Sequence, residues 1–392
     1  MHTQLLALLH HHHFHSSTSI LDSSSISISA PSPLSFCMAI SLSAYQVADL
    51  CLGKPPLRSL FSSATIATAL AALKSSPDTF LSVWTCDHKI SNLDSNCVCV
   101  AKICIADIIC YLCKKENASS PASSLNQPLS LLLSHSTSRV THIDPSASLL
   151  EAIDLMIQGA QNLVVPIRSS ISSSRRKRSS ATAIHEFCWL TQEDVVRFLL
   201  SSIGLFSPIA TLPIETLGVI TPNFLSVEYN CAAASAIGAI SRSLAEQTSV
   251  AVVDEEGGLI GEISPLALSC CDETAAAAVL TLSAGDLMAY VECGGPTEEM
   301  VRVVEEKLKE RKLKGMVKEI MVAATSNAGM AMGRRAEAVV CHRGSSLVAV
   351  MIQAITCRVS YVWVMEDDCS VGGIVTFANM LHVFREHFDS LI

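Results

Sequence analysis

Charged side chains, aromatic rings and long apolar runs are scarce in this sequence of 392 residues. Only 16% of the residues are charged and 5% are aromatic, whereas 49% are hydrophobic, and the formal net charge is −9. Low charge combined with many apolar residues excludes a disordered chain. The negative balance argues against nucleic acid as the main partner. Because no apolar run approaches the length of about 18 residues that spans a bilayer, we expect a soluble protein without a membrane partner.

Common enzyme motifs are also lacking. The sequence contains no Gly-x-x-x-x-Gly-Lys phosphate loop, no Gly-x-Ser-x-Gly elbow and no His-Glu-x-x-His metal motif. We therefore expect no catalytic residues and no enzymatic activity.

The first 37 residues form a low-complexity leader. It has a histidine run at 10–13 and a serine-rich stretch at 16–35, and the first basic residue of the whole chain is Lys54. A signal peptide would need a longer apolar core, and a plastid transit peptide would normally carry arginine. We interpret the leader as disordered or untranslated, with a plastid transit peptide as the alternative.

Cysteine is abundant, with 16 copies. Six of them fall within one segment: Cys86, Cys97, Cys99, Cys104, Cys110 and Cys113. A disulfide framework is typical of small secreted domains, and the spacing matches no familiar zinc motif. We therefore favour reduced, buried thiols over a metal site, which indicates a reducing compartment such as the cytoplasm.

One pattern recurs four times along the chain: an apolar helix, a strand, a turn, a second strand, and a small or hydroxyl residue that opens another helix. In the clearest copy, Leu149, Ala152, Ile153 and Met156 recur at the 3–4 residue spacing of an amphipathic helix. Short strands are also expected before the helices, at 47–50, 139–143, 225–228, 286–290 and 337–341.

The four copies predict a domain organisation. A first pair spans residues 44–204, with one motif at about 44–115 and the next at about 136–204. A second pair spans 210–390, with motifs at about 214–270 and at about 283–290 plus 336–390. A charged helix and linker are inserted at 296–335. Because one β-α-β-β-α unit is too small to bury both faces of its sheet, we expect an α/β fold of two pseudo-symmetric pairs.

These repeats resemble CBS domains over nearly all of residues 44–388. The stretches Val-Ala-Asp-Leu-Cys-Leu-Gly-Lys-Pro-Pro-Leu-Arg-Ser-Leu (47–60) and Gln-Thr-Ser-Val-Ala-Val-Val-Asp (247–254) are similar to plant proteins with four CBS motifs. The resemblance implies two tandem CBS (Bateman) modules. It also implies clefts that can hold AMP, ADP, ATP or S-adenosylmethionine.

In ligand-binding CBS proteins, the aspartate of Ser/Thr-x-x-Asp accepts the ribose hydroxyls and the Ser/Thr meets a phosphate. Only the second copy is complete, with Thr191 and Asp194. The first copy keeps Asp107 but has Cys104 at the Ser/Thr position. Weaker candidates come from the two later copies: Ser264, Thr376 and Asn379. The alternative for each is an ordinary helix cap, because the same spacing forms a capping box.

The resemblance implies a non-catalytic regulatory protein that senses an adenosine nucleotide and modulates an unknown partner protein. Two alternatives stay open: an interaction scaffold whose ligand sites have decayed, and a γ-like regulatory subunit of an SNF1/AMP-activated kinase complex. Self-association into a homodimer is also implied by resemblance. The basic run Arg175–Arg178 is interpreted as part of a solvated loop, with nuclear import as the alternative.

Overall fold

The structure is a computed structural model that describes residues 45–76, 78–86, 97–133, 140–167, 186–292, 297–313, 315–317 and 337–391. The leader, the basic run 175–178 and the linker 323–333 lie outside these residues, so the interpretations made for them stay predictions. Among the described helices, none is long and apolar enough to cross a membrane.

Four small sheets, each of three strands, form the framework. The first sheet contains β1 (Ser59–Phe61), β2 (Leu81–Thr85) and β3 (Val98–Ile103), and the second β4 (Val140–His142), β5 (Asn162–Ile167) and β6 (Glu186–Thr191). The third contains β7 (Ser226–Glu228), β8 (Val250–Val253) and β9 (Leu259–Ile263), and the fourth β10 (Val340–His342), β11 (Tyr361–Met365) and β12 (Val371–Thr376). Each sheet with its helices is called a unit below, numbered one to four in chain order.

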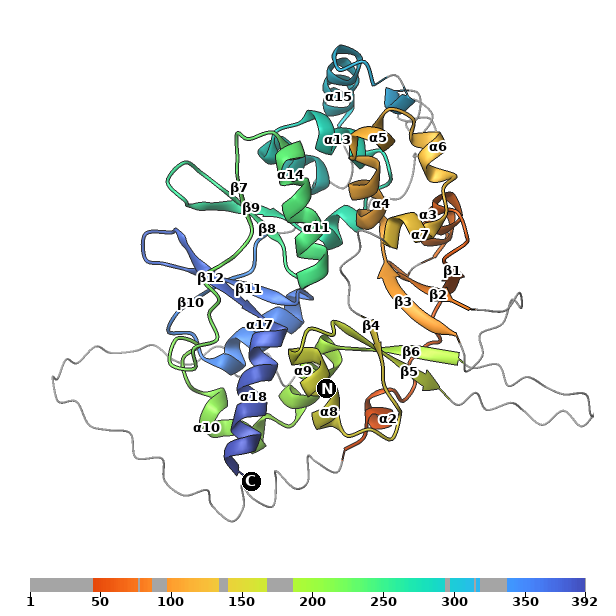
Figure 1. Cartoon of the computed structure of the whole chain (residues 1–392). Coiled ribbons are helices and arrows are strands. Elements are labelled where there is room, and N and C mark those ends of the chain that lie inside the picture. The colour runs from red at the N-terminus through yellow and green to blue at the C-terminus, as the bar shows by residue number, and fades with distance from the viewer. Residues whose placement is uncertain are drawn as a thin grey trace, which may run out of the picture.

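The helices alternate with these strands (Figure 1). Units one and two contain α2 (Val47–Leu50), α3 (Ile66–Lys74), α4 (Ile105–Leu112), α5 (Lys115–Ala118), α6 (Pro121–Leu125), α7 (Leu129–Leu133), α8 (Leu149–Ile157) and α9 (Gln192–Ser201). The connection and units three and four contain η2 (Ile203–Phe206), α10 (Ser207–Ala210), η3 (Ala233–Ala236), α11 (Ile237–Glu246), α12 (Pro265–Ser269), α13 (Ala275–Thr281), α14 (Ala284–Glu292), α15 (Glu298–Glu310), α17 (Leu347–Cys357) and α18 (Phe377–Leu391).

All four sheets share one topology. The first and second strands run parallel and are connected by a helix, whereas the second and third form an antiparallel pair. Units three and four repeat the arrangement. The predicted α/β fold of repeated β-α-β-β-α units is thus confirmed.

Hydroxyl residues start the helices that follow the first strand in units one, two and four, whereas η3 of unit three follows Ala232 without a side-chain cap. Thr65, Ser148 and Ser346 each accept a hydrogen bond from the backbone N–H three residues later. Such caps satisfy N–H groups that the helix leaves unpaired, which is why the helix begins at that residue. Local sequence therefore determines where units one, two and four turn from strand to helix.

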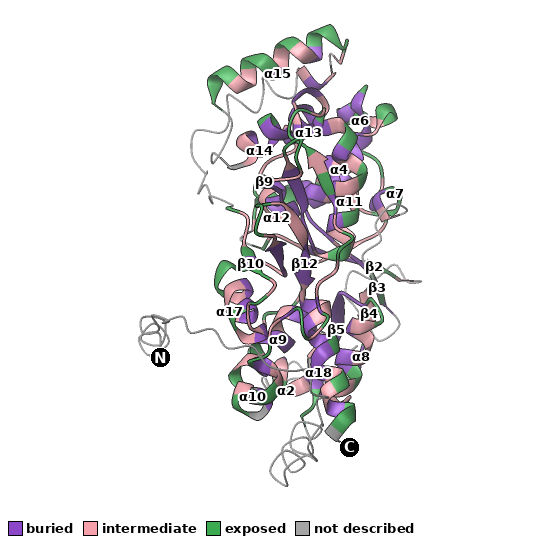
Figure 2. Cartoon of the chain, turned by 90° about the vertical axis from the view of Figure 1, so that its left-hand side faces the viewer, coloured by how far each residue is buried: buried purple, intermediate pink, exposed green. Residues whose placement is uncertain are grey.

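The units pack in two directions. Sheets of units one and two share a small apolar cluster around Trp84, and those of units three and four share one around Trp363. Two larger cores join the helices of unit one to unit three and those of unit two to unit four. The four units therefore lie at the corners of one body, with buried residues along its middle (Figures 1 and 2).

Two predicted strands are wrong. Residues 47–50 form the helix α2, because the Asp49 carboxylate accepts the backbone N–H of Gln46 and stabilises a turn. Residues 286–290 lie within α14, where the Ser283 hydroxyl caps the N–H of Asp286. In both places a polar side chain satisfies the helix start, which an apolar pattern alone does not reveal.

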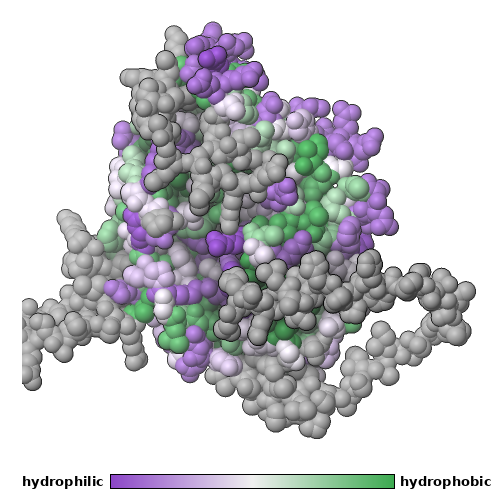
Figure 3. Space-filling model, turned by 180° about the vertical axis from the view of Figure 1, so that it is seen from behind, coloured by the Kyte–Doolittle hydropathy of each residue, from purple (hydrophilic) through white to green (hydrophobic). Residues whose placement is uncertain are grey.

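The charged helix predicted near residue 298 is present as α15. Its Val304 and Leu308 are buried, and it packs against α13. Hydrophilic side chains gather at the end of the molecule where α15 lies (Figure 3). The helix thus has one face in the core and one in solvent, rather than being exposed all round.

The prediction of reduced thiols is wrong for one pair of cysteines. Cys86 and Cys97 form a disulfide, because Cys86 directly follows Thr85, Cys97 directly precedes Val98, and the antiparallel pairing of Thr85 with Val98 brings the two cysteines side by side. Twelve other cysteines in the described part of the chain are free.

Candidate functional site

A cavity of about 260 Å³ lies where all four units meet. Unit one lines it with Phe80, Lys102, Cys104 and Asp107, and unit two with Gln161, Asn162, Thr191 and Glu193. Unit three adds Ser241, Ser243, Leu244, Ala245, Gln247, Thr248, Ser264, Pro265, Leu266 and Ser269, and unit four adds Arg358, Val359, Ser360, Tyr361 and Phe377. The volume lies just below the usual range of small-molecule sites.

Lys102 and Arg358 are the two cations of the cavity lining, and Lys102 is the more buried of the two. It lies at the end of β3, its Nζ donates to Asn162 Oδ1 at 2.9 Å, and the same atom lies 4.1 Å from the centre of the Phe80 ring. No carboxylate of the described residues lies within ion-pair distance of it. Burial lowers the pKa of this ammonium to about 8, because the charged form loses its hydration.

Polar groups on the opposite side of the cavity come from unit three. The Thr248 side chain is buried, and its hydroxyl has no hydrogen-bond partner among the described residues. Gln247 Nε2 reaches across to the carbonyl oxygen of Gln161 at 3.4 Å, which links unit three to unit two. One occupant of the cavity could therefore contact both the Lys102 ammonium, which has no carboxylate partner among the described residues, and the unpaired Thr248 hydroxyl.

The structure brings three of the predicted site residues to the cavity and leaves three outside its lining. Asp107, Thr191 and Ser264 line it. Asp194, Thr376 and Asn379 are absent from the lining, although Phe377, next to Thr376, contributes. The complete Thr191–Asp194 pair is thus divided, with only its hydroxyl residue at the cavity.

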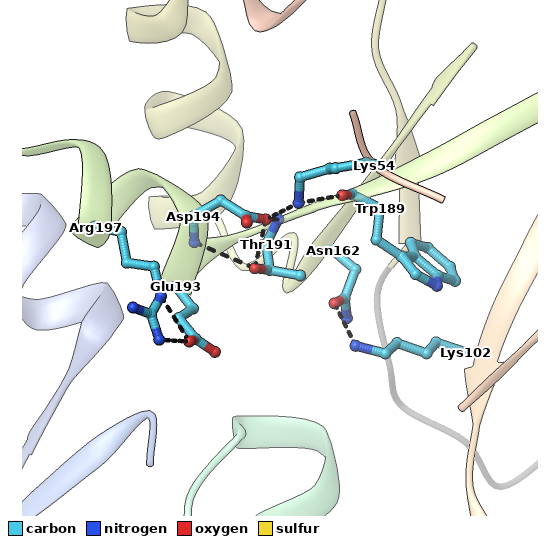
Figure 4. Close-up of polar contacts among 8 residues, drawn as sticks. All are labelled: Lys54, Lys102, Asn162, Trp189, Thr191, Glu193, Asp194 and Arg197. Carbon is cyan, nitrogen blue, oxygen red and sulfur yellow. Dashed lines mark hydrogen bonds and ion pairs between the residues drawn. The ribbon is translucent and has the colours of Figure 1, made fainter. Parts of the chain in front are cut away.

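The Asp194 carboxylate is occupied by groups of the chain itself (Figure 4). Its Oδ2 accepts the backbone N–H and the hydroxyl of Thr191, both at 2.7 Å, and the Lys54 Nζ at 2.5 Å. In return, Thr191 Oγ1 accepts the N–H of Asp194. This is a capping box with a lysine added to it, so the capping alternative describes the residue as it stands.

The equivalent positions in the other units are also caps. Asn379 Oδ1 accepts the N–H and the hydroxyl of Thr376, and Asp107 accepts the N–H of Cys104 at 2.8 Å. Burial raises the pKa of the Asp107 carboxyl. Ser264 caps α12 through the N–H of Leu266.

A second buried charge occurs in unit three. Glu262 of β9 is 5% exposed and accepts the Tyr361 hydroxyl at 2.6 Å and the Trp363 Nε1 at 2.7 Å. Both donors come from β11 of unit four. This carboxylate joins the two sheets of its pair.

The sequence interpretation missed Lys54, Lys102 and Glu262. A signal for Lys102 and Glu262 exists, because each is a charged residue inside an otherwise apolar third strand of its unit, where alternation favours burial of one face. The described residues contain no cluster of three or more His, Cys, Asp or Glu side chains that could hold a metal ion.

Comparisons with known proteins agree with this architecture, although no family model matches the chain. The CBS domain-containing protein CBSX5 of Arabidopsis thaliana is 46% identical over 90% of this chain and 100% of its own length. The SNF1-related protein kinase regulatory subunit gamma-like PV42b of the same plant is 22% identical over 73% of this chain and 75% of its own.

A solved structure shows the same fold. Protein MJ1225 of Methanocaldococcus jannaschii, proposed as an archaeal homologue of g-AMPK, superimposes with a TM-score of 0.55 at 16% identity, covering 87% of this chain and 100% of its own. With four repeated units of one topology and a relative at 46% identity over its full length, this chain belongs to the CBS domain-containing protein family.

Proposed function

We propose that this protein is a non-catalytic regulatory protein that binds a phosphate-bearing adenosine ligand in the cavity between its four units. The observation that carries the proposal is Lys102, a cation that is partly buried, faces the cavity and has no carboxylate partner in the described chain. A buried charge is costly unless an opposite charge compensates it, so an anionic ligand is favoured there.

The rest of the lining supports a nucleotide in particular. Phe80, Leu244 and Val359 provide apolar walls for a base, and hydroxyl and amide groups such as Thr191, Thr248 and Asn162 can position polar atoms. The helices α4 and α9 begin at Cys104 and Thr191 on the cavity wall, where the positive end of the helix dipole favours a phosphate.

The cavity also supports a regulatory mechanism. Since each unit contributes side chains to it, a ligand that binds there contacts both pairs at once. Its binding free energy would favour the arrangement of units that fits it best, and that arrangement is what a partner protein would recognise.

The test is thermal unfolding of the full chain with AMP, ADP, ATP and S-adenosylmethionine, for the wild type and for Lys102→Met. The matched control is Lys309→Met, which removes an exposed lysine of α15. A ligand at 100 times its Kd should add about 2.7 kcal/mol to the free energy of unfolding. We expect at least one phosphate-bearing ligand to raise the midpoint of the wild type and of Lys309→Met but not that of Lys102→Met. The proposal fails if none does, or if Lys102→Met responds like the wild type.

A scaffold without ligand is the second candidate function. It is favoured by the caps at Asp194 and Asn379, where Asp194 Oδ2 and Asn379 Oδ1 already accept hydrogen bonds from the chain itself, and by Ala267 in the carboxylate position of unit three. It predicts that none of the four ligands shifts the midpoint. The γ-like kinase subunit rests on the PV42b relative and the likeness to MJ1225; co-purification of a protein kinase with the tagged chain from plant tissue would support it.

A further inference from the structure

The segment 45–58, called the strap below, runs along unit two before the chain enters the sheet of unit one. The backbone N–H groups of Val47 and Ala48 donate to the carbonyls of Ala147 and Pro145, both at 2.9 Å. Further along, the Leu57 N–H donates to the Phe187 carbonyl at 2.8 Å. The strap is therefore attached to unit two near both of its ends.

Lys54 lies between these attachment points and points at the start of α9. Its Nζ donates to the Trp189 carbonyl at 2.9 Å and to the Asp194 carboxylate. The side chains of this pair are only 22% and 25% exposed. Lys54 thus pairs with the Oδ2 atom of Asp194, which belongs to the one Ser/Thr-x-x-Asp motif that is complete among the four repeats.

The local backbone fixes this lysine in place. Gly53, with a φ of +77°, makes a left-handed turn just before it, and Pro55 and Pro56 follow. A proline restricts its own φ and disfavours helical geometry in the residue before it. The lysine is consequently presented from a stiff segment, which lowers the entropy lost in forming the ion pair.

The second pair of units shows that the fold itself does not need this cation. There the segment before β7 forms a backbone bridge between Thr221 and Ile374, which stands two residues before Thr376 as Trp189 stands two before Thr191. The Thr221 hydroxyl lies 3.4 Å from Asn379 Oδ1. The neutral contact between Thr221 and Asn379 therefore attaches the segment before β7 to unit four. A positive charge is not needed for such an attachment, so the charge of Lys54 must have a different role.

We propose that the strap is an autoinhibitory clasp, in which Lys54 occupies the Asp194 carboxylate and excludes the ribose hydroxyls of a nucleoside from it. The inference rests on the proposed function and concerns the regulation of the same site. Thr191 lines the cavity and donates its backbone N–H and its hydroxyl to the Asp194 carboxylate, so the clasp lies beside the cavity that would hold the phosphate. A ligand held at Lys102 gains the ribose contact only when Lys54 leaves Asp194.

Isothermal titration calorimetry of the full chain with adenosine and 2′-deoxyadenosine tests the clasp. We expect Lys54→Met to bind adenosine on the order of tenfold more tightly than the wild type, since a freed carboxylate accepts the hydroxyls. The gain should be absent with 2′-deoxyadenosine and in the double variant Lys54→Met/Asp194→Asn. The matched control Lys54→Arg keeps the ion pair and should bind like the wild type.

An unchanged adenosine affinity in folded Lys54→Met would overturn the clasp, and so would an equal gain for 2′-deoxyadenosine. If Lys54→Met does not fold, Lys54→Gln provides the same comparison, because it removes the charge but keeps a hydrogen-bond donor. Adenosine carries no phosphate, so its binding does not depend on Lys102. A failure of the phosphate site is therefore seen with AMP, ADP and ATP, and a failure of the clasp with adenosine.

Discussion

The two pairs of units carry opposite charges at the same place. Lys102 is paired in register with Ser82, the second residue of β2, and Glu262 with Ala251, the second residue of β8. Their partners correspond as well, because Asn162 and Tyr361 each begin the middle strand of the neighbouring unit. One buried charged contact thus joins the sheets within each pair.

The surroundings of the two charges differ. Tyr361 and Trp363 donate to the two carboxylate oxygens of Glu262, which is not part of the cavity lining although Tyr361 is. The ammonium of Lys102 has one side-chain acceptor, Asn162, and faces the cavity. A buried carboxylate whose hydrogen bonds are all made within the protein, such as that of Glu262, stabilises the fold. A buried ammonium that still has N–H donors facing a cavity, such as that of Lys102, is suited to binding a ligand.

The largest effect is expected for the buried contact of Glu262 with Tyr361 and Trp363. Glu262→Ala should lower the free energy of unfolding by about 3 kcal/mol, because it leaves the Tyr361 and Trp363 donors buried without an acceptor. Glu262→Gln, which keeps one acceptor, should cost about 1 kcal/mol. Urea unfolding followed by circular dichroism measures both. A loss below about 1 kcal/mol for the alanine variant would show that this carboxylate is not the closed structural contact described here.

Removal of the Lys102 charge, which faces the cavity, should change the free energy of unfolding in the opposite direction. At pH 7 and without ligand, Lys102→Met should raise the free energy of unfolding by about 2 kcal/mol, since it removes a cation whose pKa is depressed by burial. The folded pKa is about 8 and the ordinary value is 10.5. Below pH 8 the cost of the charge is constant, and between pH 8 and 10.5 the wild type regains stability because the unfolded chain binds more protons.

Urea unfolding of both chains at pH 7, 9 and 10.5 checks this sign. The advantage of Lys102→Met should shrink as the pH rises. An advantage that stays constant, or a variant that is less stable at pH 7, would contradict the assignment of an uncompensated cation.

The two straps provide a smaller comparison. Lys54→Gln should cost about 1 kcal/mol, because a quarter-exposed ion pair is partly screened by solvent. Thr221→Val, which removes the neutral contact to Asn379, should cost about 0.5 kcal/mol. Thermal unfolding of Lys54→Gln and Thr221→Val measures the two losses of stability. Equal losses would show that the ion pair of Lys54 and the neutral contact of Thr221 stabilise their segments to the same extent.

The smallest effect is expected at Asp107. Asp107→Asn should lie within about 0.5 kcal/mol of the wild type at pH 7, since an asparagine at the same position of unit four, Asn379, caps its helix in the same way. The raised pKa of Asp107 means that the wild type loses stability as the pH rises above 3.8. The free energy of unfolding of Asp107→Asn, relative to that of the wild type, should therefore rise between pH 4 and pH 7. Urea unfolding at both pH values measures this difference.

Much of the fold could be predicted because it depends on local patterns. The apolar spacing of Leu149, Ala152, Ile153 and Met156 predicts the helix α8, and all four residues are buried. The turn Asp254–Gly258 is equally local, since Asp254 Oδ1 accepts the N–H groups of Glu256 and Gly258. The errors at 47–50 and 286–290 arose where a polar cap outweighed strand propensity.

The candidate site could be predicted only in part. The Ser/Thr-x-x-Asp spacing locates the start of α9, and the incomplete copies Cys104–Asp107 and Thr376–Asn379 locate those of α4 and α18, but a capping box and a ribose site have the same spacing. What distinguishes them at Asp194 is Lys54, which is 140 residues away in sequence. Neither the strap nor the register of β2 with β3 is contained in a motif.

The sequence alone is enough to predict the four repeats and most of their strands and helices, because these follow from side-chain periodicity and hydrogen bonds between near neighbours. The helices at 47–50 and 286–290 are the exceptions. The tertiary structure decided which cysteines pair, which carboxylate meets Lys54, and that the cavity lies between the pairs and contains Lys102. Those outcomes depend on contacts between residues far apart in the chain, and only the packing of the units brings them together.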